Sequence, residues 1–589
     1  MSQPAIPVSL NYNSSKPARS ASFVGHAKLI GGLTLISRIT GLGREIVAAH
    51  YLGTQTVASA FTVAFTIPNL FRKLFGEGAL AAAFIPLYAQ AVKREQDPSA
   101  IEASDPNAIQ QSANDFAAAS VNLLCMFLLG LTVLGEGILL ALIHFNSARP
   151  ADEIVLGRLL TLKFTAIMLP YVLLICGTAF LGAILQVHKR FGAPAAAPII
   201  LNVCHVAVVL VGAKMLHLHR GLPEQTTLQL QTTLAYWLSA FVLVAGAMQA
   251  MILLPSLRAT GFRFKPVLHV WTPAVGRMLK LTVPVAIGAG VLQLSVLLDK
   301  GMSVLLMQDK DAAGQLVTHF TMLGHRFVYP MVNGAPARLN LAQFLYQFPL
   351  GVFAIALATA IFPNLSAVAL DKDREHFKSV LRQGIEATLF EGFAASVGLI
   401  LIREPAVKFF FQHGWVTAAD AMLISRSVLF YSAAIWAFSL QQILNRAYYA
   451  LHDTKTPLVM SIVTLGVNLV VELPLVWTSL GEAGMAVGTM VSFAAQSVVM
   501  LYMLDRRLGG LGLEKSLRPV LKMLAATGLM TAACLLVRQS PIYPHAASRA
   551  AWAIQMAMVM AVGAAVYIGA CTLMGVETMK HFMPRRKKT

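Results

Sequence analysis

Four basic side chains lie inside the first two long apolar segments of the chain: Arg38, Arg44, Arg72 and Lys73. At the centre of a bilayer, a charged side chain costs about 2.5–3.5 kcal/mol on insertion scales, so it usually faces a water-filled cavity or a partner. Arginine suits an anionic ligand because its planar guanidinium matches phosphate oxygens with two parallel hydrogen bonds. The four residues therefore predict a hydrated, cationic cavity that accepts a phosphate-bearing anion.

Helical spacing decides whether these groups can share one cavity. Arg38 and Arg44 are six residues apart, which places them about 120° from each other at about 100° per residue, so both can border one wide cavity. Glu45 and Glu77 are the acidic residues of the same two segments, so two positive charges remain unneutralised. For the basic pair of the second segment another interpretation stays open, in which both side chains lie at the membrane interface and extend to water.

Other chemistry is sparse in this chain. Asp299 and Lys300 lie inside the seventh apolar segment and either neutralise each other or line a second part of the cavity. The motifs G-x-x-x-x-G-K-[ST], H-E-x-x-H and C-x-x-C do not occur, and the five cysteines stand singly in apolar stretches, where they are expected to be small buried side chains. The pattern predicts no catalytic residue, metal or cofactor, and favours a secondary transporter coupled to the membrane potential or to a monovalent ion.

Composition supports this class of protein. Of the 589 residues, 57% are hydrophobic and 12% charged, and the mean hydropathy is +0.66; soluble proteins carry roughly 25% charged residues. The net charge of +19 comes from 46 basic and 27 acidic residues. Because most basic residues fall in short loops between apolar segments, they indicate the orientation bias of membrane proteins and not a nucleic acid partner.

The apolar segments predict an all-α polytopic membrane protein. A spanning helix needs about 20 mainly apolar residues. By this criterion fourteen helices are expected at about 28–52, 57–91, 115–146, 158–187, 194–216, 230–255, 275–307, 340–367, 383–403, 425–450, 457–478, 482–504, 518–538 and 549–574. Alternate loops are rich in Lys and Arg, which places both termini in the cytoplasm.

Two parts of the chain resemble each other. Pro68 and Pro349 stand in similar surroundings 281 residues apart, and Pro194 and Pro457 do so 263 residues apart. Chance similarity between apolar sequences is one explanation. The other is a parallel repeat, with two six-helix lobes related by an axis along the membrane normal and the substrate site between them; two helices then remain at the C-terminus.

The repeat divides the chain into five parts. The predicted parts are a disordered cytoplasmic tail (1–26), an N-lobe with helices one to six (27–256), a C-lobe with helices seven to twelve (257–505), helices thirteen and fourteen (506–574) and a basic cytoplasmic tail (575–589). The C-lobe contains a long polar outer loop, 308–339, which is either an ordered lid or a flexible loop.

Several motifs resemble one known family. Residues 37–45 read SRITGLGRE and residues 67–79 read IPNLFRKLFGEGA, followed by Phe348-Pro349 and by HDTKTP at 452–457. This combination resembles the MurJ (MviN) lipid II flippase family, within the multidrug/oligosaccharidyl-lipid/polysaccharide exporter superfamily.

The resemblance implies a function and a set of site residues. It implies movement of lipid II, an undecaprenyl-pyrophosphate-linked disaccharide-pentapeptide, from the inner to the outer leaflet of the bacterial cytoplasmic membrane for peptidoglycan synthesis. The partners implied are lipid II, membrane lipids and cell-wall synthesis proteins. Helices thirteen and fourteen would form a groove for the polyprenyl tail. The residues expected to meet the pyrophosphate are Arg38, Arg44, Arg72 and Lys73, and those expected to support the cavity are Glu45, Glu77, Ser59 and Asn69.

This sequence also departs from the family pattern. Many members carry an acidic residue where Ser59 stands, and acidic and arginine residues in the eighth helix where this chain has Gln343, Phe344 and Gln347. The usual basic ligand of the C-lobe is therefore missing. Either Arg338 substitutes for it or the N-lobe holds the headgroup alone. The residues expected on the C-lobe side are Arg338, Gln343, Gln347, Asp299 and Lys300.

Three other functions remain open at this point. An exporter of another polyprenyl-linked glycan would use the same cationic cavity. A drug/cation antiporter of the same superfamily would rely on buried carboxylates, whereas basic residues dominate here. A membrane scaffold without transport activity would tolerate loss of the cavity charges.

Overall fold

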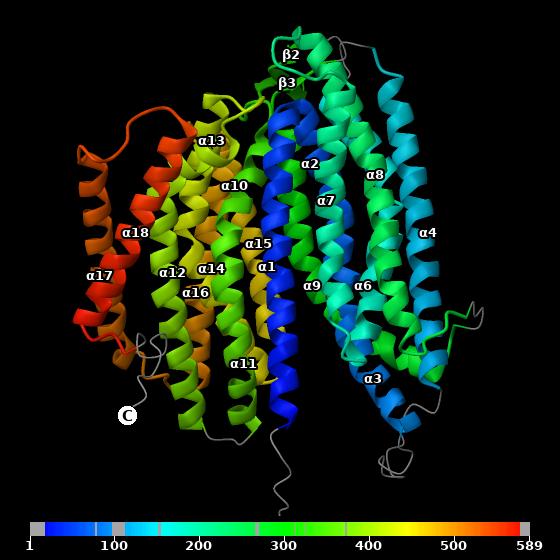
Figure 1. The fold of residues 1–589 in the computed structure, drawn as a ribbon, viewed down its shortest axis with the longest axis vertical. Helices are drawn as coiled ribbons and strands as arrows, with labels where there is room; N and C mark the ends of the chain where they lie inside the picture. Colours follow the sequence, from blue (N-terminus) through cyan, green and yellow to red (C-terminus); the bar gives the residue numbers. More distant parts are fainter. Residues whose placement is uncertain are drawn as a thin grey trace, which may run out of the picture.

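Long helices that run roughly parallel make up nearly all of the protein (Figure 1). The computed structural model describes residues 18–76, 79–96, 112–150, 155–265, 270–311, 314–322, 324–370 and 374–577. Its helices are α1 (Ala18–Leu52), α2 (Thr56–Phe71), α3 (Ala79–Gln96), α4 (Ala113–Ser147), α5 (Leu156–Met168), α6 (Tyr171–Val187), α7 (Gly192–Met215), α8 (Glu224–Arg258), α9 (Pro273–Leu305), α10 (Ala335–Pro349), α11 (Ile355–Leu370), α12 (Arg374–Phe411), α13 (Ala418–Ala433), α14 (Ile435–Ala450), α15 (Lys455–Val476), α16 (Ala483–Arg507), α17 (Glu514–Gln539) and α18 (Arg549–Leu573), with π-helical turns η1 (Arg72–Gly76) and η3 (Leu350–Ala354).

These helices correspond to the fourteen predicted spans. In the described residues, eight helices are long and apolar enough to cross a bilayer alone, and ten spans result if the bent pairs α5–α6 and α13–α14 each count as one. The remaining four predicted spans correspond to α1 and α9, which carry charged residues, and to α2–α3 and α10–α11, each of which is interrupted by a π-helical turn. The prediction of an all-α polytopic membrane protein is confirmed.

Four spans that the apolar pattern presents as continuous helices are broken. The second and eighth contain η1 and η3, and the fourth and tenth bend by 47° and 41°. A π-helical turn is an extra residue in the helical ladder, and hydropathy does not reveal it. The breaks fall in matching helices of the two halves, which supports the parallel repeat over chance similarity.

The helices pack into two lobes with separate apolar cores. Phe84, Phe116 and Phe164 belong to the core of the N-lobe (α1–α8). Two further clusters lie mainly in the C-lobe (α9–α16), and one of them also includes Ala49 of α1. The first turns of α9 pack against the N-lobe core through Val275 and Met278, so this helix bridges the lobes. The pair α17–α18 packs on α12 (Figure 1). The exact domain limits stay a prediction.

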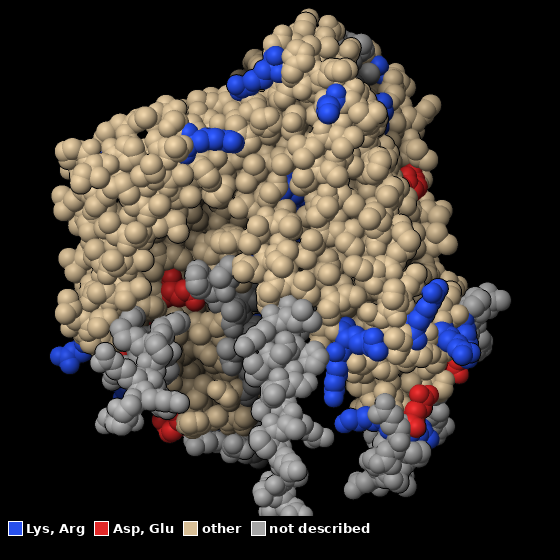
Figure 2. Space-filling model, viewed as in Figure 1, with Lys and Arg blue, Asp and Glu red and all other residues tan. Residues whose placement is uncertain are grey.

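The outer surface is suited to lipid. Large apolar side chains are exposed along the helices, among them Val133 (63% exposed), Leu134 (62%) and Val470 (72%). On the face shown in Figure 2, Lys and Arg gather near the two ends, and the wide band between them is almost free of charge. An apolar surface of this extent needs a lipid environment. The chain is therefore a multi-pass membrane protein.

The described part of the chain begins with α1 and ends after α18 at the same end of the molecule (Figure 1). Helix α1 begins there at Ala18, so the prediction of a disordered tail over residues 1–26 is wrong for residues 18–26, which are helical. Residues 1–17 and 578–589, which hold most of the two predicted tails, lie outside the described residues. We refer to this end as the terminus end.

The opposite end carries two small antiparallel sheets, and we call it the hairpin end. Strand β1 (Asp309–Lys310) pairs with β2 (Leu316–Val317), and β3 (His319–Met322) pairs with β4 (His325–Val328). Phe320 packs against Trp477 at the end of α15. Of the two interpretations of the loop 308–339, the ordered one therefore holds for the described residues, and from Ala335 onward the segment is already helix α10.

Candidate functional site

A cavity of about 1190 Å³ lies between the two lobes. Side chains of α1, α2, η1, α6 and α7 line it from the N-lobe, and side chains of α9, α10, α13–α14, α15 and α16 line it from the C-lobe. Its described lining includes five cationic side chains (Arg38, Arg44, Arg72, Lys73 and Lys300) and two acidic ones (Glu45 and Asp299). The predicted cationic cavity between the lobes is therefore present.

Arg44 is held from the N-lobe side. Its guanidinium forms an ion pair with Glu45 (Nη2–Oε1 2.6 Å) and donates to Asn202 Oδ1 of α7 at 3.3 Å. It also lies over the ring of Phe65, 5.4 Å from its centroid. Three neighbours therefore fix a guanidinium that borders the cavity.

Asn202 anchors the helix that carries both arginines. Its amide nitrogen donates to the carbonyl oxygen of Ser37 and to Thr40 Oγ1, both at 3.1 Å. Sequence reasoning missed this residue, although an amide inside an apolar span was a signal for it.

Helix α1 also contacts the C-lobe. Asn340 of α10 donates to Glu45 Oε2 at 3.2 Å. The ring of Phe344 lies against Gly41, close enough that a Cβ there would contact it at 3.4 Å. Helix α1 therefore lies at the contact between the two lobes and also lines the cavity.

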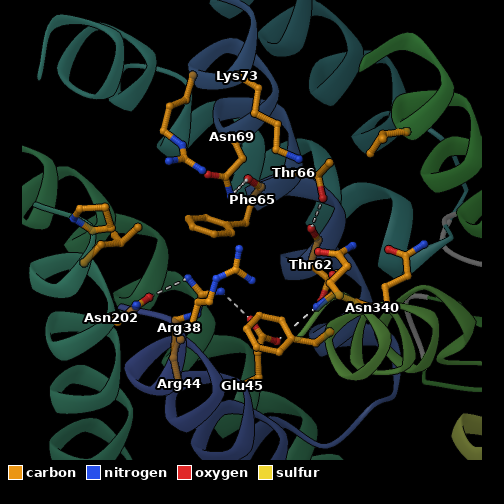
Figure 3. A pocket seen from close by; sticks show the side chains of 18 of the residues that line it. Arg38, Arg44, Glu45, Thr62, Phe65, Thr66, Asn69, Lys73, Asn202 and Asn340 are labelled. Atoms are coloured by element: carbon orange, nitrogen blue, oxygen red, sulfur yellow. Dashed lines mark hydrogen bonds and ion pairs between the residues drawn. The ribbon is translucent and has the colours of Figure 1, made fainter. Parts of the chain in front are cut away.

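The second group of predicted ligands also borders the cavity. Arg72 and Lys73 lie in η1, and both line the space between the lobes, so the interpretation that leaves them at the membrane interface is not supported. Figure 3 shows Arg38 and Arg44 reaching from α1 into the space toward which Lys73 and Asn69 are directed.

Of the residues predicted to support the cavity, only some line it in the described part of the chain. Glu45 and Asn69 line the cavity. Ser59 does not: it is fully buried and donates to the carbonyl oxygen of Thr54 at 3.1 Å, so its assignment to the cavity is wrong. Glu77 lies outside the described residues.

On the C-lobe side, Gln343, Gln347, Asp299 and Lys300 all line the cavity. Gln343 donates to the hydroxyl of Tyr431 at 3.1 Å. Lys300 is 5% exposed, and its Nζ has no hydrogen-bond partner among the described residues.

Asp299 faces a polar cluster on α15. Asn468 donates to Asp299 Oδ1 at 3.2 Å and to Glu472 Oε2 at 3.0 Å. No ion pair joins Asp299 to Lys300 in the part of the chain that the structure describes. Of the two sequence interpretations, lining the cavity holds for both residues.

Arg338 does not substitute for the missing ligand. It is completely buried, pairs with Glu482 (Nη2–Oε2 2.6 Å) and Asp420 (Nη1–Oδ1 3.1 Å), and donates to the carbonyl oxygen of Asn333 at 2.7 Å. These partners saturate the guanidinium, and Arg338 is not among the cavity-lining residues. The expectation that it faces the cavity is wrong.

The lobes are joined at the hairpin end, close to this buried group. Thr54 Oγ1 donates to Asp420 Oδ1 at 2.8 Å, and Thr56 Oγ1 donates to Asp309 Oδ1 at 3.0 Å. The turn between α1 and α2 is thus bonded to the C-lobe. A network of buried polar contacts holds the two lobes together on this side of the cavity.

Among the described residues, no group of three or more His, Cys, Asp and Glu side chains could hold a metal ion. What the cavity offers is fixed positive charge beside amide and hydroxyl groups. Such an arrangement can bind an anion that carries several oxygen acceptors.

Comparison with known proteins agrees with the geometry. A curated protein of Bdellovibrio bacteriovorus, named probable lipid II flippase MurJ, is 28% identical over 509 residues, covering 86% of each chain. The lipid II flippase MurJ of Burkholderia cenocepacia is 28% identical over 489 residues, covering 81% of this chain and 83% of its own.

Solved structures show the same fold. A lipid II flippase MurJ in an inward closed conformation superposes with a TM-score of 0.67 at 20% identity, covering 94% of this chain and 99% of its own. An inward-facing multidrug resistance MATE family transporter of the MOP superfamily gives 0.58 at 13% identity, covering 82% of this chain and 98% of its own. The model of the family described as lipid II flippase MurJ matches residues 48–546, and the chain belongs to this family.

Proposed function

We propose that this chain moves lipid II from the inner to the outer leaflet of the bacterial cytoplasmic membrane. The observation that carries the proposal is the charge of the interlobe cavity, in which five cationic side chains face two acidic ones among the described lining residues. A pyrophosphate that carries about two negative charges complements this excess, and arginine binds phosphate oxygens in pairs. The charge therefore favours a diphosphate, and the family indicates that this diphosphate is the polyprenyl-linked headgroup of lipid II.

In the proposed mechanism the two lobes alternate access to the cavity. Arg38, Arg44, Arg72 and Lys73 meet the pyrophosphate from the N-lobe, and Lys300 meets it from the C-lobe. Like charges on the two walls repel each other, and the diphosphate between them permits the lobes to close. Each elementary charge moved across the membrane is worth about 2.3 kcal/mol per 100 mV, so we propose that the membrane potential resets the cationic cavity.

The polyprenyl tail follows a separate route in this mechanism. Helices α17 and α18 stand beside α12, outside the two lobes (Figure 1), and the hydroxyl of Tyr567 donates to the carbonyl oxygen of Phe390 at 2.7 Å. We propose that this helix pair guides the isoprenoid chain, which stays in lipid while only the headgroup crosses the cavity.

Orientation follows from the loops. Basic residues concentrate at the terminus end, where Lys93, Arg190, Arg263 and Arg507 lie at the ends of helices or in short loops. Because positively charged loops remain on the cytoplasmic side, we propose that both termini are cytoplasmic and that the hairpin end faces outward. The function is transport, without chemical change of the substrate.

Accessibility labelling of the lipid II headgroup tests the proposal. Cells depleted of this protein and rescued with the wild-type chain should show headgroups in the outer leaflet. The Arg38→Ala and Arg44→Ala variants should fail to restore labelling or growth at normal protein levels. Arg506→Ala is the matched control, since this arginine is exposed near the end of α16 and outside the cavity lining. Growth of both cavity variants at the wild-type rate would contradict the cavity assignment.

The same cells separate the remaining functions. Labelling of a different polyprenyl-linked glycan, with lipid II unchanged, would show another exported substrate. Drug resistance that is lost in the Glu45→Gln variant would indicate an antiporter that relies on carboxylates.

A further inference from the structure

Arg38 of the N-lobe is in contact with Gly351 of the C-lobe. Gly351 lies in η3 of the C-lobe, immediately after helix α10. A methyl group placed on its Cα would overlap the Nη1, Nη2 and Cζ atoms of Arg38. The guanidinium of an N-lobe helix therefore packs directly on the C-lobe backbone at a position where the absence of a Cβ makes room for it.

This contact is part of a regular stripe on α1. Arg38, Gly41 and Glu45 follow the spacing i, i+3, i+7, which places them on one face of a helix. A Cβ on Gly41 would contact Phe344 of the C-lobe at 3.4 Å and Asn202 of the N-lobe at 3.5 Å, and Glu45 accepts a hydrogen bond from Asn340. The stripe fixes α1 on α10 and η3, and Arg38 is its one member with a positive charge.

The neighbouring arginine behaves differently. Arg44 is held by Asn202 and Glu45, both on the N-lobe, whereas Arg38 reaches the C-lobe. Both guanidinium groups also line the cavity. Arg38 thus belongs both to the cavity lining and to the contact between the lobes.

We infer that Gly351 is a docking position for Arg38, and that a diphosphate in the cavity competes with Gly351 for the same guanidinium. The inference rests on the proposed function. Binding of the anion draws Arg38 away from η3 and so loosens the stripe between the lobes. The headgroup is thereby coupled to lobe movement, because a ligand shifts a conformational equilibrium only through contacts that differ between the two states.

Gly351→Ala is the direct test of this contact. The added methyl group meets the far end of a flexible side chain, so it displaces the guanidinium and leaves the backbone in place. Gly398→Ala is the matched control, because a Cβ on this glycine of α12 would have nothing within 4 Å. Both changes are made in the full-length chain, in the wild-type background and in the Arg38→Ala background.

The first measurement needs no ligand. The apparent unfolding temperature of the purified protein should fall with Gly351→Ala in the wild-type background and should not fall in the Arg38→Ala background. This non-additivity reports the contact itself. An equal change in both backgrounds, including failure to fold in both, would overturn the docking position, whereas failure to fold only where Arg38 is present would support it.

The second measurement is the affinity for farnesyl diphosphate, a short diphosphate amphiphile. If docking sequesters Arg38, Gly351→Ala should tighten binding by about three- to tenfold, since removal of a competing state raises the competent fraction. In the Arg38→Ala background it should have no effect. Unchanged or weaker binding by Gly351→Ala, or a change matched by Gly398→Ala, would overturn the competition.

The two measurements also separate this inference from the proposed function. If the wild-type chain did not bind farnesyl diphosphate, the proposed diphosphate site would fail and the competition with it. The unfolding cycle would still report whether Arg38 docks on Gly351.

Discussion

Arg338 at the hairpin end and the two arginines of α1 have different surroundings, although the sequence predicts the two arginines as ligands of one anion and leaves Arg338 open as a further ligand. Two carboxylates and two backbone carbonyls surround Arg338, which is buried. Arg38 and Arg44 border the interlobe cavity. A guanidinium whose donors are saturated inside the protein holds elements together, whereas one that faces a cavity can bind.

Removal of the buried arginine should have the largest effect. Arg338→Ala leaves Glu482 and Asp420 buried without their cation, and loss of one partner of a buried ion pair costs about 3–5 kcal/mol. We expect strongly reduced protein levels in the membrane and a lower apparent unfolding temperature. The triple change Arg338→Met, Glu482→Gln and Asp420→Asn should recover part of the loss. Normal folding of Arg338→Ala together with lost transport would instead make it a ligand.

Replacement of Arg44, one of the two cavity-lining arginines of α1, by lysine tests whether a cavity arginine acts through its charge alone. Arg44→Lys keeps the charge but loses the planar fork that reaches both Asn202 and Glu45. A lysine cannot replace an arginine at a site with paired hydrogen bonds. We expect transport in the labelling assay to fall about tenfold, with unchanged protein levels. Full activity of Arg44→Lys would show that charge alone is sufficient there.

Lys300 offers an intermediate case, since it is buried like Arg338 but lines the cavity like Arg44. Because its Nζ has no hydrogen-bond partner in the described part of the chain, Lys300→Gln breaks no hydrogen bond. We expect farnesyl diphosphate to bind about tenfold more weakly, as for the loss of one charge-assisted contact, with little change in unfolding temperature. Lys300→Arg should retain binding. A large loss of stability with unchanged affinity would assign Lys300 a structural role.

Ser59 should show the smallest effect. Its hydroxyl donates to the carbonyl oxygen of Thr54 and lies away from the cavity. Ser59→Ala should lower the free energy of unfolding by about 1 kcal/mol, the usual contribution of one hydrogen bond, and should leave transport unchanged. A transport defect of Ser59→Ala at normal stability would instead indicate that Ser59 contributes to the cavity.

Apolar periodicity and charge placement revealed most of the architecture. Runs of about 20 apolar residues have one stable environment, the bilayer, and this fixed the number of spans before any contact was known. The breaks at η1 and η3 escaped prediction, because Pro68 and Pro349 mark both helices but do not show where the ladder gains a residue. The same holds for Gly351, whose role depends on a side chain from the other lobe.

The sequence by itself determined that this is a membrane protein with unneutralised positive charge in its first two spans, because a charge within a span needs water or a partner wherever the chain folds. Only the tertiary structure decided which of these charged side chains face the water-filled cavity and which have a protein partner. The carboxylates of Arg338 lie 82 and 144 residues away along the chain, and no local pattern announces a partner at that separation. Packing of the two lobes brought those groups together and left Arg38, Arg44 and Lys300 on the wall of the cavity, where charge can act on a ligand.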